Sequence, residues 1–265
     1  MPRLLVKPAG HSGCVTRVTP QDAGWTYVGF ELQRLAAGDT VSGHAPDRET
    51  CLVWVTGKGR ASAEGRDFGQ LGGRQSPFEG VPAALYVPAG SPWSVTATSP
   101  LELAVCTAPG IAGARPSRLI ASQDLTKETR GKGTNTRYVT NILPEGQPAD
   151  SLLVVEVITP GGHTSSYPPH KHDQDNLPHE SLLEETYYHR LDPPQGFAFQ
   201  RVYTDDRSLD EAMAVEDGDV VLVPRGYHPC AACHGYDLYY LNVMAGPKRT
   251  WKFHNAAEHE WLLKG

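Results

Sequence analysis

The sequence predicts an all-β protein built as a sandwich or barrel. The chain contains 27 glycines and 22 prolines spread evenly along it, so turn signals recur at short intervals. Between these signals stand short runs in which apolar and polar residues alternate, as they do in half-buried strands. Apolar spacing typical of an amphipathic helix is almost absent. Many short strands divided by regular turns favour a sandwich or barrel over a mixed fold.

The expected strands follow in order along the chain. Each is a run rich in β-branched or aromatic residues that ends at a glycine, proline or polar cluster. In the first half they cover residues 25–32, 50–55, 83–88 and 101–106; in the second half they cover 152–158, 185–189, 197–204, 220–223 and 236–244.

The two halves resemble one another, which indicates an internal duplication. Tyr86-Val87-Pro88-Ala89-Gly90 matches Leu222-Val223-Pro224-Arg225-Gly226 in type and order. We therefore expect two barrels in one chain. The expected ranges are 1–115 for the first barrel, 116–150 for a linker that leads into the second barrel, and 151–265 for the second barrel. Within the linker, residues 130–133 (Arg-Gly-Lys-Gly) are expected to be flexible.

Composition restricts the partners. A formal net charge of −6 without any Lys/Arg-rich run argues against a nucleic acid or an anionic membrane, and favours a small polar substrate. No apolar stretch approaches the roughly 20 residues of a membrane helix. Five cysteines without framework spacing and no signal peptide indicate a cytoplasmic protein. Exposed barrel strands suggest a homo-oligomer.

The most informative motif is a candidate metal site. His170 and His172 flank Lys171, and side chains of a strand alternate, so both histidines share one face while Lys171 points away. Glu185 opens the next expected strand, and His228 follows the Pro-Arg-Gly turn. Three imidazoles and a carboxylate form a ligand set for a divalent cation.

The carboxylate has competitors, because the gap from His172 to the expected acidic ligand is long. Glu180 and Glu184 are both available. Strand register favours Glu185, since Tyr187 and His189 would then share its inward face.

Two other clusters suggest less. Cys230 and Cys233 lie beside His228, but a structural zinc needs four converging ligands and no second Cys-x-x-Cys supplies them. We interpret them as ordinary thiols near the site. In the first half only His44 lies near the equivalent turn, so that barrel is expected to be metal-free.

The second-half pattern resembles the cupin double motif, and longer strings resemble the 5-deoxy-glucuronate isomerase family over nearly the whole chain. The strings are PPHKHD (168–173), LEETYYHR (183–190), PQGFAFQRVY (194–203) and YYLNVMAG (239–246). The resemblance implies a bicupin fold of two double-stranded β-helix (jelly-roll) barrels. It also implies an isomerase of inositol catabolism that converts the aldehyde 5-deoxy-glucuronate into the ketone 5-keto-2-deoxy-gluconate. The implied metal ligands are His170, His172, Glu185 and His228.

Such a reaction moves a proton between neighbouring carbons through an enediolate. We expect one divalent metal ion, zinc first and Mn, Fe, Co or Ni as alternatives, to stabilise the enediolate. His189 is the candidate base, and Tyr187 and Tyr203 could polarise or donate. For the substrate carboxylate the candidates are Arg201, Lys171 and Arg190. An arginine is favoured because a guanidinium binds in a bidentate manner, and Arg201 is preferred.

Two other functions stay open at this point. Three histidines and a glutamate also hold Fe(II) in cupin dioxygenases. A bicupin could instead bind a sugar acid without catalysis.

Overall fold

The computed structural model describes residues 3–264 and confirms the all-β prediction. Within this range the α-helical residues are those of α1 (Pro20–Ala23), and the other helices are the short 3-10 segments η1 (Ser122–Asp124), η2 (Gly133–Asn135) and η3 (Ala257–Lys264). The described chain divides into two compact units. We call residues 8–126 and 141–155 the N-terminal unit, and residues 3–7, 127–140 and 156–264 the C-terminal unit.

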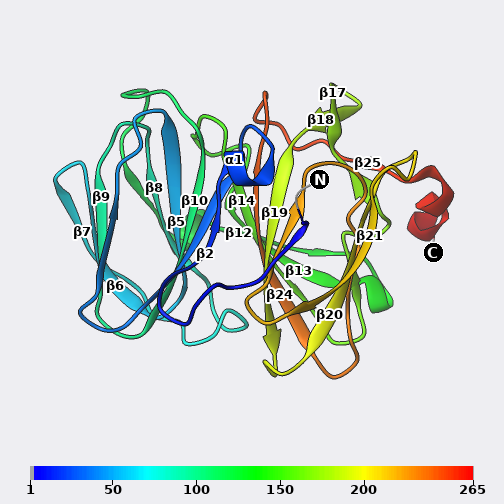
Figure 1. Ribbon diagram of the computed structural model, residues 1–265, viewed down its shortest axis with the longest axis horizontal. Helices are drawn as coiled ribbons and strands as arrows, with labels where there is room; N and C mark the ends of the chain where they lie inside the picture. Colours follow the sequence, from blue (N-terminus) through cyan, green and yellow to red (C-terminus); the bar gives the residue numbers. More distant parts are fainter. Residues whose placement is uncertain (1–2, 265) are drawn as a thin grey trace. The chain divides into compact units, whose positions relative to one another are not determined.

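The N-terminal unit consists of two antiparallel sheets (Figure 1). The six-stranded sheet has the order β11-β8-β5-β10-β3-β2, and the four-stranded sheet has the order β4-β9-β6-β7. Its strands are β2 (Gly13–Val18), β3 (Gly29–Leu35), β4 (Thr40–Gly43), β5 (Arg48–Thr56), β6 (Lys58–Ala63), β7 (Arg66–Gly72), β8 (Ala83–Val87), β9 (Trp93–Ala97), β10 (Leu101–Pro109) and β11 (Arg118–Ile120).

A core of buried apolar side chains from both sheets holds this unit together. Trp54 on β5 and Leu103 on β10 are fully buried, and Val95 on β9 packs in the same cluster from the other sheet. Burying one such side chain contributes about 1.5–3 kcal/mol. The expected runs 50–55 and 101–106 coincide with β5 and β10, whereas β9 was not expected from the sequence.

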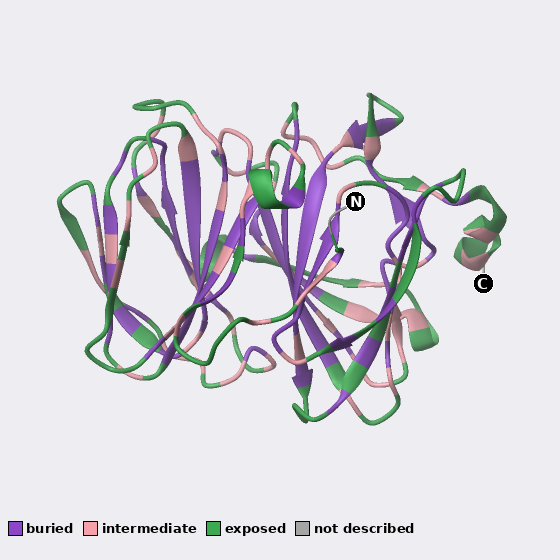
Figure 2. Ribbon diagram, in the orientation of Figure 1, coloured by how far each residue is buried: buried purple, intermediate pink, exposed green. Residues whose placement is uncertain are grey.

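The C-terminal unit contains a seven-stranded sheet in the order β1-β22-β19-β24-β14-β13-β12, a four-stranded sheet in the order β15-β23-β20-β21, and two short two-stranded pairs, β16-β25 and β17-β18. Figure 2 shows buried residues along β19 and β24. The strands are β1 (Leu5–Val6), β12 (Thr126–Arg130), β13 (Arg137–Leu143), β14 (Leu153–Thr159), β15 (Thr164–Ser165), β16 (His170–Lys171), β17 (Asp173–Asn176), β18 (Glu180–Leu182), β19 (Glu184–Asp192), β20 (Phe197–Tyr203), β21 (Asp210–Glu216), β22 (Val220–Val223), β23 (Cys230–Ala232), β24 (Asp237–Ala245) and β25 (His254–Asn255).

The expected linker contains regular structure, which corrects the sequence interpretation of residues 130–133. Arg130 ends β12, Gly133 begins η2, and the next strand is β13. β12 shows little apolar alternation because most of its residues are exposed, so its pairing in the sheet left no hydrophobic pattern. The unit boundaries after residues 126 and 140 fall inside the expected linker, whereas the boundary after residue 155 falls inside the range expected for the second barrel.

Glu49 forms hydrogen bonds that hold the 141–155 segment in place within the N-terminal unit. Its side chain is fully buried, and its carboxylate accepts hydrogen bonds from the hydroxyl of Tyr86 (2.6 Å) and from the backbone N–H groups of Asp150 (2.7 Å), Ser151 (2.6 Å) and Leu152 (2.6 Å). Four donors, two of them in fully buried hydrogen bonds, therefore depend on one side chain.

We expect Glu49→Ala to lower the free energy of unfolding by about 3 kcal/mol or more, because it leaves these donors without an acceptor. Chemical denaturation followed by tryptophan fluorescence measures this change. Glu79→Ala is the matched control, since Glu79 is exposed, and it should shift the free energy by no more than about 0.5 kcal/mol. Equal stability of the two variants would contradict this role for Glu49.

Candidate metal centre

The His-x-His pair lies in the C-terminal unit, where β16 pairs with β25. The rings of His170 and His172 are 6.4 Å apart between centroids, and both histidines are buried. Lys171 points elsewhere, as predicted: its ammonium lies 2.8 Å from the carboxylate of Asp173 and 3.4 Å from that of Glu180. The alternation of the strand thus separates the imidazoles from the ammonium.

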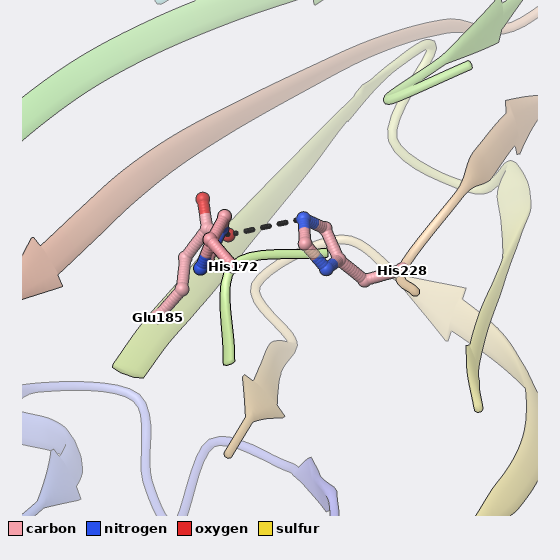
Figure 3. Close-up of side chains that lie close together, drawn as sticks. All are labelled: His172, Glu185 and His228. Carbon is pink, nitrogen blue, oxygen red and sulfur yellow. Dashed lines mark hydrogen bonds and ion pairs between the residues drawn. The ribbon is translucent and has the colours of Figure 1, made fainter. Parts of the chain in front are cut away.

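Glu185 lies opposite Val223 and Met244 on the neighbouring strands of β19, and its carboxylate faces two imidazoles. Its Oε2 is 3.1 Å from Nε2 of His172 and 3.3 Å from Nε2 of His228. Figure 3 shows these side chains directed toward one another. We call His172, Glu185 and His228 the triad; one ligand atom from each lies within 4.8 Å of the others, so the triad could hold a metal ion.

His170 stands beside the triad and not within it. Its ring centroid is 4.9 Å from that of His228, edge to face. A second aromatic ring, that of Phe253, packs against its other side at 4.6 Å.

A glycine turn delivers His228. Gly226 has φ 89°, and a Cβ atom there would lie 2.4 Å from the carbonyl oxygen of Tyr203, so only glycine fits. The N–H of Gly226 donates to Asp173 (2.9 Å), which ties this turn to the segment that carries His172. Asp173 therefore links the two histidine-bearing segments.

Backbone carbonyls orient both triad histidines. Nδ1 of His172 donates to the carbonyl of Leu183 (3.0 Å), and Nδ1 of His228 donates to that of Gly226 (2.9 Å). In the neutral tautomer that this fixes, each Nε2 presents a lone pair toward Glu185. Nε2 of His228 is buried and makes no hydrogen bond within the described chain. Because this nitrogen carries a lone pair and no proton, it can coordinate a cation.

Burial sets the protonation of this cluster. It lowers the pKa of His228 to about 3 and, together with the neighbouring histidines, lowers the pKa of His170. Burial also raises the pKa of Glu185. Burial also lowers the pKa of His172, but its contact with Glu185 more than offsets this, so the pKa of His172 is raised. His170 and His228 are thus neutral imidazoles at pH 7, the form that binds metals.

The structure brings Glu185, and neither of its two competitors, into the triad. The carboxylate of Glu180 faces Lys171 and accepts from the backbone N–H of Asp173 (2.7 Å). Glu184 is buried but falls on the opposite face of β19, because neighbouring side chains of a strand alternate. Cys230 and Cys233 are free thiols, and neither belongs to a metal-capable group among residues 3–264.

Of the candidate catalytic residues, Tyr187 and His189 lie near the triad. The ring of Tyr187 is 5.8 Å from that of His228 and stacks on that of His189 at 5.9 Å. The Tyr187 hydroxyl is 2.9 Å from that of Ser166. His189 is fully buried, and its Nε2 lies 2.9 Å from Oε1 of Gln200. Its Nδ1 has no hydrogen-bond partner among residues 3–264, and burial lowers its pKa to about 4.

Tyr203 and Arg201 are not placed at the triad. Tyr203 packs against Tyr227 and Ala256. Arg201 lies on the exposed face of β20, where Asp210 accepts two hydrogen bonds from its guanidinium, both 2.7 Å. Alternation along β20 explains this, since Gln200 and Val202 occupy the buried face. The proposed carboxylate-binding residues Arg201 and Lys171 are thus both occupied by acidic partners.

Arg137, at the start of β13, was missed by the sequence analysis. Its positive charge acts on His170, Tyr187, Tyr240 and Cys230. It stands in the segment that the sequence suggested as a linker; the run Tyr-Val-Thr-Asn-Ile-Leu that follows it, rich in β-branched residues, was the available signal for a strand.

The sequence model of the KduI/IolB family matches residues 4–262. The chain belongs to the KduI/IolB family. A relative from Geobacillus kaustophilus named 5-deoxy-glucuronate isomerase is 56% identical over 267 residues, covering 100% of this chain and 96% of its own. One of the same name from Bacillus subtilis is 49% identical over 271 residues and covers 100% of both chains.

Solved structures agree with this assignment. An IolB-like protein from Salmonella typhimurium superposes with a TM-score of 0.97 at 53% identity, covering 98% of this chain and 99% of its own. Oxalate decarboxylase from Lactobacillus farciminis superposes with a TM-score of 0.67 at 14% identity, covering 100% and 91%, which is a likeness of fold alone. This KduI/IolB protein is an all-β bicupin, as predicted. Its described helices include none long and apolar enough to span a membrane.

Proposed function

We propose that this protein is a metal-dependent aldose-ketose isomerase that converts 5-deoxy-glucuronate into 5-keto-2-deoxy-gluconate in myo-inositol catabolism. The observation that carries the proposal is the buried triad, found in a chain whose relatives named 5-deoxy-glucuronate isomerase are 49–56% identical over their length. The substrate is a small sugar acid, which fits a protein with no Lys/Arg-rich run.

His172, Glu185 and His228 would hold one divalent ion, with His170 beside them as a fourth ligand. Two neutral imidazole nitrogens and a carboxylate fit zinc first, and also accept Mn, Fe, Co or Ni. A bound divalent ion would supply Lewis-acid stabilisation of the negative charge that develops on the substrate oxygens.

The chain itself must move the proton. With Nε2–H of His189 donating to Gln200, Nδ1 carries the lone pair, and it has no other partner in the described chain. His189 would take the proton from the carbon beside the carbonyl and return it to the neighbouring carbon. The hydroxyl of Tyr187, held by Ser166, would orient a substrate oxygen. Burial of both side chains excludes water from the transfer.

The setting follows from the activity. We infer a cytoplasmic enzyme, which the five free cysteines support: Cys51 and Cys106 lie opposite one another on β5 and β10 and form no disulfide. We also infer a homo-oligomer and a metal-free N-terminal barrel.

The test is turnover of 5-deoxy-glucuronate in deuterated water, with and without oxygen. We expect the ketone at the same rate in both, deuterium at the carbon that gains the proton whenever the base exchanges with solvent, and no turnover after chelation. Product that appears only with oxygen would identify a dioxygenase. Binding without turnover in the presence of Zn, Mn, Fe, Co or Ni would identify a non-catalytic sugar-acid binding protein.

A further inference from the structure

A sugar acid carries a negative charge that the triad does not neutralise, so its pocket needs a cation. Many arginines of the described chain are already paired with carboxylates. The pairs include Arg34 with Glu102, Arg115 with Asp150, Arg190 with Asp217 and Arg201 with Asp210. Arg130, whose charge also acts on His170, is paired with Glu128.

Arg137 differs from these arginines in its partners. It is half-buried, and its guanidinium donates from Nη1 to the backbone carbonyl of Asn135 (3.0 Å) and to Oδ1 of the same residue (3.1 Å). Both acceptors are neutral, and Arg137 forms no ion pair anywhere in residues 3–264. Burying a cation without a counter-charge costs free energy, and a bound anion would remove this cost.

Hydrogen bonds connect this guanidinium, through Asn135 and segment 164–167, to the residues of the proposed reaction. Asn135 accepts from the hydroxyl of Thr164 (3.2 Å) and donates to the carbonyl of Tyr167 (2.9 Å), so it bridges both ends of segment 164–167. Within that segment, the hydroxyl of Ser165 contacts that of Tyr240 (2.5 Å) and the hydroxyl of Ser166 contacts that of Tyr187 (2.9 Å).

The turn before Arg137 leaves room for its guanidinium only because of a glycine. Gly131 has φ 79°, and a Cβ atom there would lie 2.8 Å from Nη1 of Arg137 and 2.0 Å from the carbonyl oxygen of Asn135. The motif Arg-Gly-Lys-Gly, which resembles a linker in the sequence, thus shapes the turn that holds Arg137.

We propose that Arg137, fixed by Asn135, binds the carboxylate of the sugar-acid substrate and makes the site select acids over neutral sugars. This rests on the proposed isomerase function. The Nη1 edge is held by Asn135, so the rest of the planar fork is available to a carboxylate, which it binds in a bidentate manner. Arg201 and Lys171 cannot serve without first leaving their acidic partners.

The experiment compares Arg137→Met with the wild-type enzyme on 5-deoxy-glucuronate and on the neutral analogue that has CH2OH in place of the carboxylate. We expect kcat/KM for the acid to fall by about 10- to 100-fold, the value of a charge-assisted bidentate contact, while kcat/KM for the neutral analogue changes little. Arg137→Lys should recover part of the preference, because it keeps the charge and loses the fork. Arg201→Met is the matched control and should behave as wild type.

Other results would contradict a role of Arg137 in binding the carboxylate. An equal loss on both substrates, in a variant with full metal content and unchanged thermal stability, would mean a merely structural role. An unchanged acid preference would overturn the proposal directly. If the wild-type enzyme turns over neither compound, the proposed function fails, and calorimetric titration with D-glucuronate then tests Arg137 alone. Wild-type binding that Arg137→Met abolishes supports the inference; no binding, or equal binding, overturns it.

Discussion

His228→Ala is expected to release the metal ion from the C-terminal unit and to lower turnover by about 10³-fold or more. Nε2 of His228 is buried and lacks any hydrogen bond in the described chain, so its place is explained by a cation shared with Glu185 and His172. Lewis-acid stabilisation contributes several kcal/mol, and each 1.4 kcal/mol is about tenfold in rate. Elemental analysis of the purified variant and the isomerase assay measure both effects.

The same assay ranks the other ligands. His170→Ala should lose less metal than His228→Ala, because His170 stands beside the triad. Glu185→Gln should weaken metal binding far more than Glu184→Gln, its matched control on the opposite face of β19. Near-stoichiometric metal in both histidine variants would contradict the centre, and the reverse order of the glutamates would mean that the wrong carboxylate was chosen.

His189→Ala is expected to keep its metal and to lose about 10²- to 10⁴-fold in turnover, the usual contribution of a general acid-base group. The unpartnered Nδ1 and the contact of the ring with Tyr187 support this role. Tyr203→Phe is the control: the Tyr203 side chain packs with Tyr227 and Ala256 and not in the triad, so the rate of this variant should stay near that of wild type. A metal-replete His189→Ala enzyme with an unchanged rate would leave His189 as a core histidine.

His189 also makes the stability of the metal-free protein depend on pH. Burial depresses its pKa to about 4, whereas an unfolded histidine has a pKa of about 6.5. Between these values the unfolded chain binds a proton that the folded chain does not. The free energy of unfolding therefore decreases as pH falls from about 6.5 to 4, and His189 accounts for about 3 kcal/mol of this decrease. His189→Gln should show a shallower pH dependence in denaturant titrations across this window; an identical slope would contradict the assignment.

The sequence by itself determined the all-β class, the inward face of β19 and the convergence of His172, Glu185 and His228. These were predictable because period-two alternation fixes which side chains share a face, and because the Pro-Arg-Gly turn before His228 has a backbone that only Gly226 can adopt. The same alternation separated Lys171 from the histidines on either side of it.

Only the tertiary structure decided which arginines are paired with carboxylates. Arg201 lies on β20 and Arg137 on β13. The carboxylate of Asp210 neutralises Arg201, whereas the neutral Asn135 only orients Arg137. Asp210 reaches Arg201 across the β20–β21 pair, and Asn135 reaches Arg137 from the end of η2. Neither contact leaves an apolar pattern in the sequence. Whether a charged side chain is neutralised depends on which groups lie within a few ångström of it in the folded chain, and the periodicity of apolar residues does not predict those neighbours.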